Sequence, residues 1–406
     1  MTRAIKRARA DNSRAQDWRA DTNLVRGGTG RSAHGETSEA IFLTSGFVYD
    51  NAEEAEARFK GEADGFIYSR YGNPTISMFE KRLALLEGAE ACFATATGMA
   101  AVFASLLCHL RAGQRVVAAR ALFGSCHFII TQLLPRWGIE TTLVDGTDLA
   151  QWKSALAPGA AAVFFETPSN PTLELIDIAA VSKLSHKAGA TVIVDNVFST
   201  PMLQRPLAHG ADIVVYSATK HIDGQGRTLG GAVLSTKQFY SEHLMPFMRH
   251  TGPAMSPFNA WVMLKGLETL AVRVERHCAN ARAVADFLAD HKGVARVYFP
   301  GHKSHPQYKL ARRQMSGPGN MVSFEIKGGK APTFRFLNAL EIVDISNNLG
   351  DTKSLITHPA TTTHRAVGPE ARARMGIGDG LVRLSVGLEN VNDLVADLDR
   401  ALKAAR

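Results

Sequence analysis

Residues 191–220, TVIVDNVFSTPMLQRPLAHGADIVVYSATK, contain two short apolar runs, and polar residues follow each of them at once. Val192–Val194 leads into Asp195, and Ile213–Tyr216 leads into a string of small residues that ends at Lys220. Continuous apolar runs of this length are typical of strands buried on both faces of a parallel sheet. Ligands bind outside the carboxyl ends of such strands, so the stretch predicts both a fold and a place for chemistry.

The same pattern extends outward from this stretch, from about residue 75 to residue 250. Helical segments such as Ala179–Ala188 alternate with short β-rich runs. This alternation predicts an α/β fold with a doubly wound parallel sheet, in which right-handed crossovers place helices on both faces. The further runs lie at 116–118, 141–144 and 163–165.

The pattern changes after residue 256. Residues 257–290 look helical, and strand-like runs then alternate with helices such as Asp393–Lys403. This pattern predicts a smaller α+β domain at the C-terminal end. We therefore expect three parts: an N-terminal arm over 1–74, a large α/β domain over 75–256 and a C-terminal α+β domain over 257–406.

The composition is that of an ordinary globular protein. Hydrophobic residues make up 45% and charged residues 21% of the 406 residues, which excludes a mostly disordered or fibrous chain. The sequence has no apolar stretch of about 18 residues, so we expect no membrane span. Its 4 cysteines form no CxxC pair, which predicts a reduced, cytoplasmic protein without a metal site.

The net charge of +8 is concentrated at the N-terminus, where residues 1–20 carry half of the excess. A basic arm can bind nucleic acid or an anionic surface. No basic patch interleaved with aromatic residues occurs elsewhere, which favours a flexible or partner-packing arm over nucleic-acid binding.

The string Ala94–Met99 precedes an apolar helical pattern that runs to Leu110. Free backbone N–H groups at a helix N-terminus, together with small hydroxyl side chains, are suited to binding a phosphate. Small residues also mark ordinary tight turns, so this string by itself leaves both interpretations open.

Lys220 and Asp195 each allow a structural and a chemical interpretation. Lys220 could be a solvated lysine, but at the end of a buried strand a desolvated amine can form a Schiff base. Asp195 could cap a helix or could hold a buried charge. A phosphate site, a lysine and a strand-end carboxylate together supply what pyridoxal phosphate requires, namely an anchor, an imine partner and an acid for the ring nitrogen.

Seven ordered strings carry a resemblance that covers nearly the whole chain: YSRYGNPT (68–75), ATGMAA (96–101), ETPSNP (166–171), VDN (194–196), SATKHIDGQG (217–226), SLITHPA (354–360) and RLSVGLE (383–389). In these strings the chain resembles the Cys/Met-metabolism family of pyridoxal-phosphate enzymes. The resemblance implies the aminotransferase-like fold, type I of the PLP-dependent transferases. It also implies a homotetramer, built as a dimer of dimers, in which the N-terminal arm contributes to the neighbouring subunit's site.

The resemblance assigns the central chemistry to a few residues. It implies that Lys220 is the Schiff-base lysine and proton shuttle, and that Asp195 pairs with the pyridinium nitrogen. Arg383 would hold the substrate α-carboxylate, a planar anion that suits a guanidinium fork. Asn348 and Arg227 are further candidates for substrate binding.

The resemblance also implies a set of cofactor contacts. Asn170 would approach the hydroxyl side of the ring. Tyr68, also a catalytic candidate, and Arg70 would reach the phosphate from the neighbouring subunit. The phosphate residues within one chain would be Thr97, Gly98, Met99, Ser217 and Thr219.

Two departures from the family pattern bear on specificity. Phe123 stands where most relatives have a tyrosine stacked on the ring, so stacking is kept and a phenol is lost. Arg227 stands where many relatives have an aspartate. The phrases LFGS and HIDGQGR are most similar to O-succinylhomoserine sulfhydrylases. Phe123 could equally be a packing substitution, and Arg227 a solvated loop charge.

The function implied is γ-replacement in methionine biosynthesis, in which a homoserine ester and sulfide give homocysteine and, for the succinyl ester, succinate. Cystathionine γ-synthase and γ-lyase activities are alternatives within the family. A non-catalytic protein that kept the fold is an alternative of another class, but the retention of Lys220 and Arg383 argues against it. We expect small-molecule partners only, with no nucleic acid or membrane.

Overall fold

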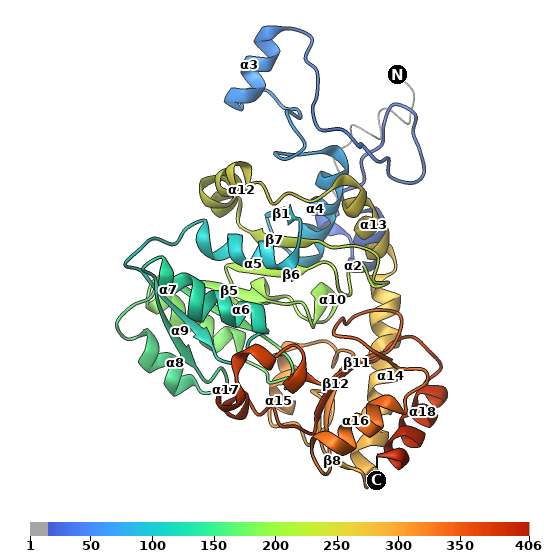
Figure 1. The fold of residues 1–406 in the computed structure, drawn as a ribbon. Helices are drawn as coiled ribbons and strands as arrows, with labels where there is room; N and C mark the ends of the chain where they lie inside the picture. The colour runs from blue at the N-terminus through green and yellow to red at the C-terminus, as the bar shows by residue number, and fades with distance from the viewer. Residues whose placement is uncertain (1–14, 406) are drawn as a thin grey trace. The chain divides into compact units, whose positions relative to one another are not determined.

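The computed structural model describes residues 15–405, which form two compact units (Figure 1). The first unit contains residues 15–109, 215–219 and 227–269, and the second unit contains 110–214, 220–226 and 270–405. Most of the basic arm falls on residues 1–14, which lie outside the described residues. The expected division at residues 74 and 256 stays a prediction.

A parallel sheet forms the centre of the second unit, with strand order β5-β4-β2-β3. The four predicted apolar runs in this part of the chain are all strands. Helices α8 (Leu149–Leu156) and α9 (Ile178–Lys187) lie side by side, and their Trp152 and Val181 pack in one core with Val163 (Figure 1). The strands are β2 Arg115–Ala119, β3 Glu140–Val144, β4 Ala162–Glu166 and β5 Thr191–Asp195.

The C-terminal part of the second unit is an α+β layer, as the sequence predicted. Its sheet has the order β10-β11-β12-β9-β8, and Phe324 in this sheet packs with Leu288, Phe336 and Leu398 from three helices. Those helices are α14 Leu270–Asp290, α16 Lys330–Asn338 and α18 Val391–Ala404. The strands are β8 Val294–Tyr298, β9 Met321–Ile326, β10 Asp344–Ile345, β11 Leu355–Thr357 and β12 Leu381–Ser385.

The first unit contains the strand order β1-β7-β6, and β1 (Ala91–Thr95) pairs antiparallel with β7 (Gly231–Ser235). The sequence predicted a parallel sheet but named neither of these two runs as a strand, so this antiparallel pair was missed. An apolar run that is buried on both faces has the same pattern whichever way the strand points, so composition did not reveal the direction. The predicted run at 213–216 is strand β6 (Ile213–Ser217).

Helix α4 (Pro74–Glu87) shows why the first unit's helices begin and end where they do. The Asn73 side chain accepts a hydrogen bond from the Thr75 N–H, and Pro74 occupies the first helical position. Gly88 ends the helix in the left-handed region at φ 81°. The other helices of this unit are α2 Ala20–Arg26, α3 Ala52–Lys60, α5 Gly98–Leu107, α11 Lys237–Phe239, α12 Met245–Thr251 and α13 Pro257–Glu268.

The second unit also contains several short helices. None of the helices among residues 15–405 is long and apolar enough to cross a membrane. The short helices are α6 Gly124–Phe128, α7 Leu134–Arg136, α10 Thr200–Leu203, α15 Tyr308–Gln314 and α17 Pro369–Arg374.

A buried ion pair ties the N-terminal segment of the first unit to α4 and α13. Arg82 is fully buried, and its guanidinium donates to Glu39 Oε1 at 2.6 Å and to the carbonyl oxygens of Gly27 and Leu264. Lys265 donates to the other oxygen of Glu39. Burial raises the pKa of Glu39, but the hydrogen bonds from Lys265 and Arg82 outweigh it and bring the pKa to about 2.

Arg82→Met is expected to lower the free energy of unfolding by about 3–5 kcal/mol, because it leaves a buried carboxylate short of a partner. Thermal melting of the apoprotein measures this. Because the fold lowers the pKa of Glu39, its contribution is present above the ordinary value of 4.5 and is lost as pH falls toward 2. The difference in melting temperature between wild type and Arg82→Met should therefore become smaller as the pH falls from 4.5 toward 2. Lys60→Met, in an exposed pair, should cost less than about 1 kcal/mol, and equal effects of both would contradict the assignment.

Candidate functional site

The first unit contains a helix N-terminus with the features of an anion site. Strand β1 ends at Thr95, and α5 begins at Gly98 after the N-cap residue Thr97, whose hydroxyl accepts from the Ala100 N–H at 3.0 Å. A Cβ on Gly98 would lie 2.5 Å from the Cβ of Ser217. The end of β6 therefore touches the start of α5, and only glycine allows this approach. The positive end of the helix dipole favours an anion here.

The residue before β7 and the first residue of that strand contact Thr219 and Thr97. Thr219 Oγ1 accepts from the Gly230 N–H at 3.0 Å and also bonds the Gly230 carbonyl at 3.2 Å. A Cβ on Gly231 would lie 2.4 Å from the Thr97 carbonyl oxygen, so the two backbones are in close contact. Met99 lies in the first turn of α5. The structure thus brings Thr97, Gly98 and Ser217 together, with Thr219 bonded to the residue before β7.

Tyr68 and Arg70 lie against another segment of the first unit. The Arg70 guanidinium lies 5.4 Å from the Tyr68 ring centroid and 4.8 Å from that of Tyr71, and it donates to the Arg249 carbonyl. Tyr68 is 42% exposed. The Tyr68 ring is therefore partly open to solvent, with the Arg70 guanidinium beside it.

Lys220 and Asn348 form a close pair in the second unit. The Lys220 Nζ donates to Asn348 Oδ1 at 2.6 Å, and the two residues are 128 positions apart. Burial, with the nearby charge of Arg383, lowers the pKa of Lys220 to about 8. An amine with this pKa is far more often neutral at physiological pH than a solvated lysine, and the neutral form is the nucleophile.

Arg383 lies on β12 and is 1% exposed. Its Nη1 donates to Asn170 Oδ1 at 3.0 Å, and its Nη2 donates to the carbonyl oxygens of Asn347 and Asn348 at 2.8 and 3.3 Å. Its buried Nε has no hydrogen-bond partner among residues 15–405. An unpaired guanidinium N–H in a buried position favours an added carboxylate. Asn348 thus contacts both Lys220 and Arg383.

Asp195 is the last residue of β5 and is partly buried. Burial raises its pKa to about 6, and its Oδ1 accepts from the Val197 N–H at 3.0 Å. The next helix, α10, begins at Thr200 with Ser199 at its N-cap position. The helix-cap interpretation of Asp195 is therefore wrong, and the interpretation as a buried acid fits the geometry.

Glu166 was assigned no role by the sequence, although it ends β4 as Asp195 ends β5. The two residues are paired in the strand register, and Glu166 is buried. Burial and the charge of Asp195 hold the pKa of Glu166 well above its usual range. A carboxylate at a strand end was the signal that could have identified it.

Comparison with known proteins decides the family. The family model of Cys/Met metabolism PLP-dependent enzymes matches residues 21–403. The chain belongs to this family. An O-succinylhomoserine sulfhydrylase of Mycobacterium tuberculosis is 59% identical over 382 residues, covering 93% of this chain and 94% of that protein. One of Pseudomonas aeruginosa is 48% identical over 401 residues, covering 96% and 99%.

Solved structures of the family confirm the predicted fold. A cystathionine gamma synthase of Xanthomonas oryzae matches with a TM-score of 0.91 and 38% identity, covering 96% of this chain and 98% of that one. A Campylobacter jejuni protein crystallised with N'-pyridoxyl-lysine-5'-monophosphate matches with a TM-score of 0.91 and 32% identity, covering 95% and 100%. The chain is an enzyme with the type I fold of PLP-dependent transferases, and its cofactor is pyridoxal 5'-phosphate, as predicted.

The residues of this family member fit the cofactor on observations of its own structure. The first unit has a helix N-terminus that lacks a Cβ at Gly98, beside the hydroxyl residue Ser217. The second unit has Lys220, whose pKa is lowered, and the partly buried acid Asp195. These are groups suited to a phosphate, an aldehyde and a ring nitrogen.

The Phe123 loop of this family member packs on a segment that the sequence did not single out. Phe123 precedes α6, and a Cβ on Gly124 would lie 2.6 Å from the Thr363 carbonyl oxygen. The next residue, His364, is fully buried, and burial, with the charge of Arg383, lowers its pKa to about 4. This neutral histidine supports the loop that carries Phe123. Its position just after the string SLITHPA was the available signal.

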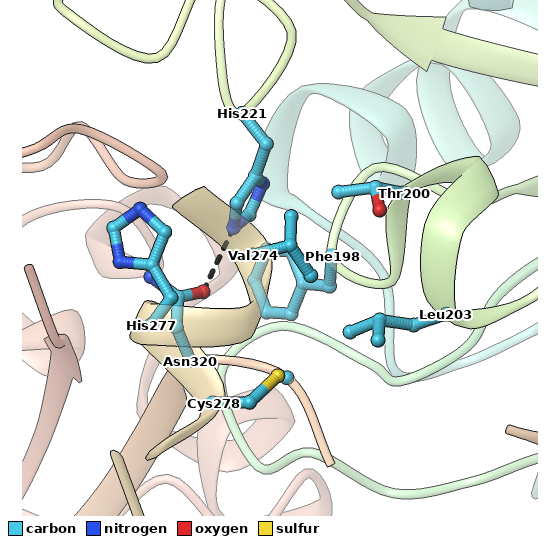
Figure 2. A pocket seen from close by; sticks show the side chains of 9 residues that line it. Phe198, Thr200, Leu203, His221, Val274, His277, Cys278 and Asn320 are labelled. Atoms are coloured by element: carbon cyan, nitrogen blue, oxygen red, sulfur yellow. Dashed lines mark hydrogen bonds between the residues drawn. The ribbon is translucent and has the colours of Figure 1, made fainter. Parts of the chain in front are cut away.

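Two buried neutral histidines, His221 directly after Lys220 and His277, line a narrow pocket that leaves no room for a water molecule (Figure 2). His221 bonds Asn320 Oδ1 at 2.8 Å, and burial lowers the pKa of His221 to about 3 and that of His277 to about 4. None of the predicted site residues lines this pocket, so it is not the predicted site. Phe198, Leu203, Val274 and Cys278 make most of its wall apolar.

Two further sequence predictions concern Arg227 and metals. Arg227 lies exposed in the loop before β7. Across residues 15–405, no cluster of three His, Cys, Asp or Glu side chains is arranged to hold a metal ion.

Proposed function

We propose that this enzyme catalyses γ-replacement on a homoserine ester, in which O-succinylhomoserine and hydrogen sulfide give homocysteine and succinate. The observation that carries the proposal is the link from Lys220 through Asn348 to Arg383, whose Nε is buried and unpaired. The link places an amine with a lowered pKa, Lys220, near a guanidinium that can bind a carboxylate, Arg383. An amino-acid substrate requires both groups. The two sulfhydrylase relatives support the choice of ester and nucleophile.

In this proposal Arg383 binds the substrate α-carboxylate through Nε and a neighbouring N–H, which orients the substrate for proton transfer. Lys220, with its pKa near 8, removes the α-proton and later returns one, and its bond to Asn348 aims the amine. Asp195 holds a proton on the ring nitrogen. Bound pyridoxal phosphate supplies the electron sink that makes Cα acidic.

The cofactor contacts in this proposal are those that the family resemblance implies. Phe123 would stack on the ring and Asn170 would approach its hydroxyl side. Tyr68 and Arg70 act in the neighbouring subunit of a homotetramer, with Tyr68 also near the reacting groups. The phosphate is held by Thr97, Gly98, Met99, Ser217 and Thr219.

Arg227 is proposed to bind the distal carboxylate of the succinyl group. Sulfide is small and needs no charged pocket, whereas cysteine brings a carboxylate and an ammonium group that must be matched. With Arg383 assigned to the α-carboxylate, Arg227 is the cationic side chain in the loop after Lys220 that the proposal assigns to the second anion.

Homocysteine from O-succinylhomoserine and sulfide is the expected main product, with cysteine a poorer acceptor. Arg227→Ala should raise the KM for the succinyl ester more than for the acetyl ester, because only the former carries the extra charge. Parallel product assays with both donors and both esters measure this, and the acetyl ester is the internal control. Faster formation of cystathionine than of homocysteine at equal concentrations would replace this proposal with a synthase. Loss of the γ-group without any acceptor would indicate a γ-lyase, the activity named for a 44% identical Porphyromonas gingivalis relative.

A further inference from the structure

Glu166 is a buried carboxyl group to which the mechanism above gives no task. It is 6% exposed and ends β4 directly opposite Asp195 on β5. A buried carboxyl group is costly unless it is paired or neutral. The contacts of Glu166 therefore bear on whether its carboxyl group is paired with a cation or is neutral.

The first contacts are to backbone. Glu166 Oε1 accepts from the Asn170 N–H at 2.8 Å, and the Phe123 backbone N–H also bonds this carboxyl group. One side chain thus joins the two segments whose side chains are proposed to stack on the cofactor ring and to approach its hydroxyl side. The Asn170 side chain in turn accepts a hydrogen bond from Arg383. A displacement of Glu166 would therefore also change the position of the Arg383 guanidinium.

The second set of contacts is electrostatic. The titratable and charged groups that face Glu166 are Asp195 from β5, Arg383 from β12 and Cys126 from α6. Burial and the charge of Asp195 raise the pKa of Glu166, and the hydrogen bonds from the Asn170 and Phe123 N–H groups, with the charge of Arg383, oppose this rise only in part. Two carboxylates this close in a buried site do not both ionise readily, so one of them keeps a proton.

We propose that Glu166 is a positioning residue that stays protonated while Asp195 is ionised, and that it holds the Phe123 and Asn170 backbones without adding a second negative charge beside Asp195. Asp195 is the member that must be charged, because it faces the ring nitrogen in the proposed function. This inference rests on that function for its role, but its tests use neither substrate nor turnover.

The first test is the pH dependence of apoprotein melting for wild type and Glu166→Gln. A group whose pKa is raised by folding binds its proton more tightly in the native state, so it makes stability fall as pH rises above its ordinary value of 4.5. The Gln variant should melt at the same temperature or higher above neutral pH and show a shallower decline. Glu140→Gln, at an exposed pair with Arg115, should leave the slope unchanged. A steeper alkaline decline, or a variant destabilised throughout, would show that Glu166 is ionised and would overturn the proposal.

The second test is the dissociation constant of pyridoxal phosphate, measured by absorbance titration of the apoprotein. Glu166→Gln keeps an acceptor oxygen and should stay within about threefold of wild type, whereas Glu166→Ala should bind about tenfold or more weakly, because two backbone N–H groups lose their acceptor. An equal loss of cofactor affinity in Glu166→Gln and Glu166→Ala would overturn the proposal that Glu166 acts as a neutral acceptor. Failure of the Gln variant to fold would also refute the proposal, because the amide is neutral and keeps an acceptor oxygen for the backbone N–H groups. A normal result here with no sulfhydrylase activity would refute only the proposed function.

Discussion

Lys220→Ala is expected to lose turnover by several orders of magnitude and to lose every covalent link to the cofactor. The wild-type amine is partly buried, has a pKa of about 8 and is aimed by Asn348, so it is both the nucleophile and the proton carrier. Borohydride reduction followed by peptide mass analysis should find the cofactor on the peptide that contains Lys220. The variant should show no labelled peptide.

The pH dependence of covalent cofactor loading is a second test of Lys220 as the lysine that binds the cofactor. Because burial lowers the pKa of Lys220 from 10.5 to about 8, the neutral amine becomes abundant as pH rises through 8. The rate of covalent loading of the apoprotein should rise over that range and level off above it. Lys237→Ala, at an exposed lysine of α11, is the control and should load normally. Label on a different lysine in the wild type would refute the assignment.

Asp195→Asn is expected to reduce turnover at least about a hundredfold while leaving the fold intact, since a fixed charge opposite developing charge is a large catalytic contribution. The amide is isosteric and keeps an oxygen for the Val197 N–H, so folding is not disturbed. It carries no negative charge, however, and so does not keep the ring nitrogen protonated. Steady-state assays and melting curves of the two proteins measure these effects.

Asp212 offers a matched control for Asp195. It also accepts a backbone N–H, from Val192 at the opposite end of β5, and pairs with His186 at the surface. Asp212→Asn should change turnover little. Near-normal turnover of Asp195→Asn would show that Asp195 serves only its backbone contact.

Much of the site could be predicted because its residues are local features of the chain. Lys220 and Asp195 each follow an apolar run, and polar residues at the ends of buried strands are visible without any tertiary information. The Gly98 turn was recognisable in the same way, because a glycine before an apolar helix is a short-range signal. In each case the neighbouring residues in the sequence are enough to mark the position as a candidate.

Contacts between distant segments could not be predicted in this way. Asn348 had no strand end or turn to mark its contact with Lys220, and the bond between Arg383 and Asn170 spans 213 positions. Such pairs depend on sheet register, and a shift of one residue turns a side chain to the other face. Glu166 and His364 were missed for this reason, since their roles come entirely from what packs around them.

The amino-acid sequence by itself determined most of the strands, the α/β class, the resemblance to PLP-dependent enzymes and the choice of Lys220 and Asp195 as the candidate lysine and acid. These follow from apolar periodicity and short motifs, which are properties of adjacent residues. Only the tertiary structure decided the antiparallel direction of β7, the partners of Arg383 and the directions in which the pKa values of Lys220, Asp195 and Glu166 are shifted. The physical reason is that strand direction has no local pattern, and that a pKa depends on how much water and charge the folded chain leaves beside each group.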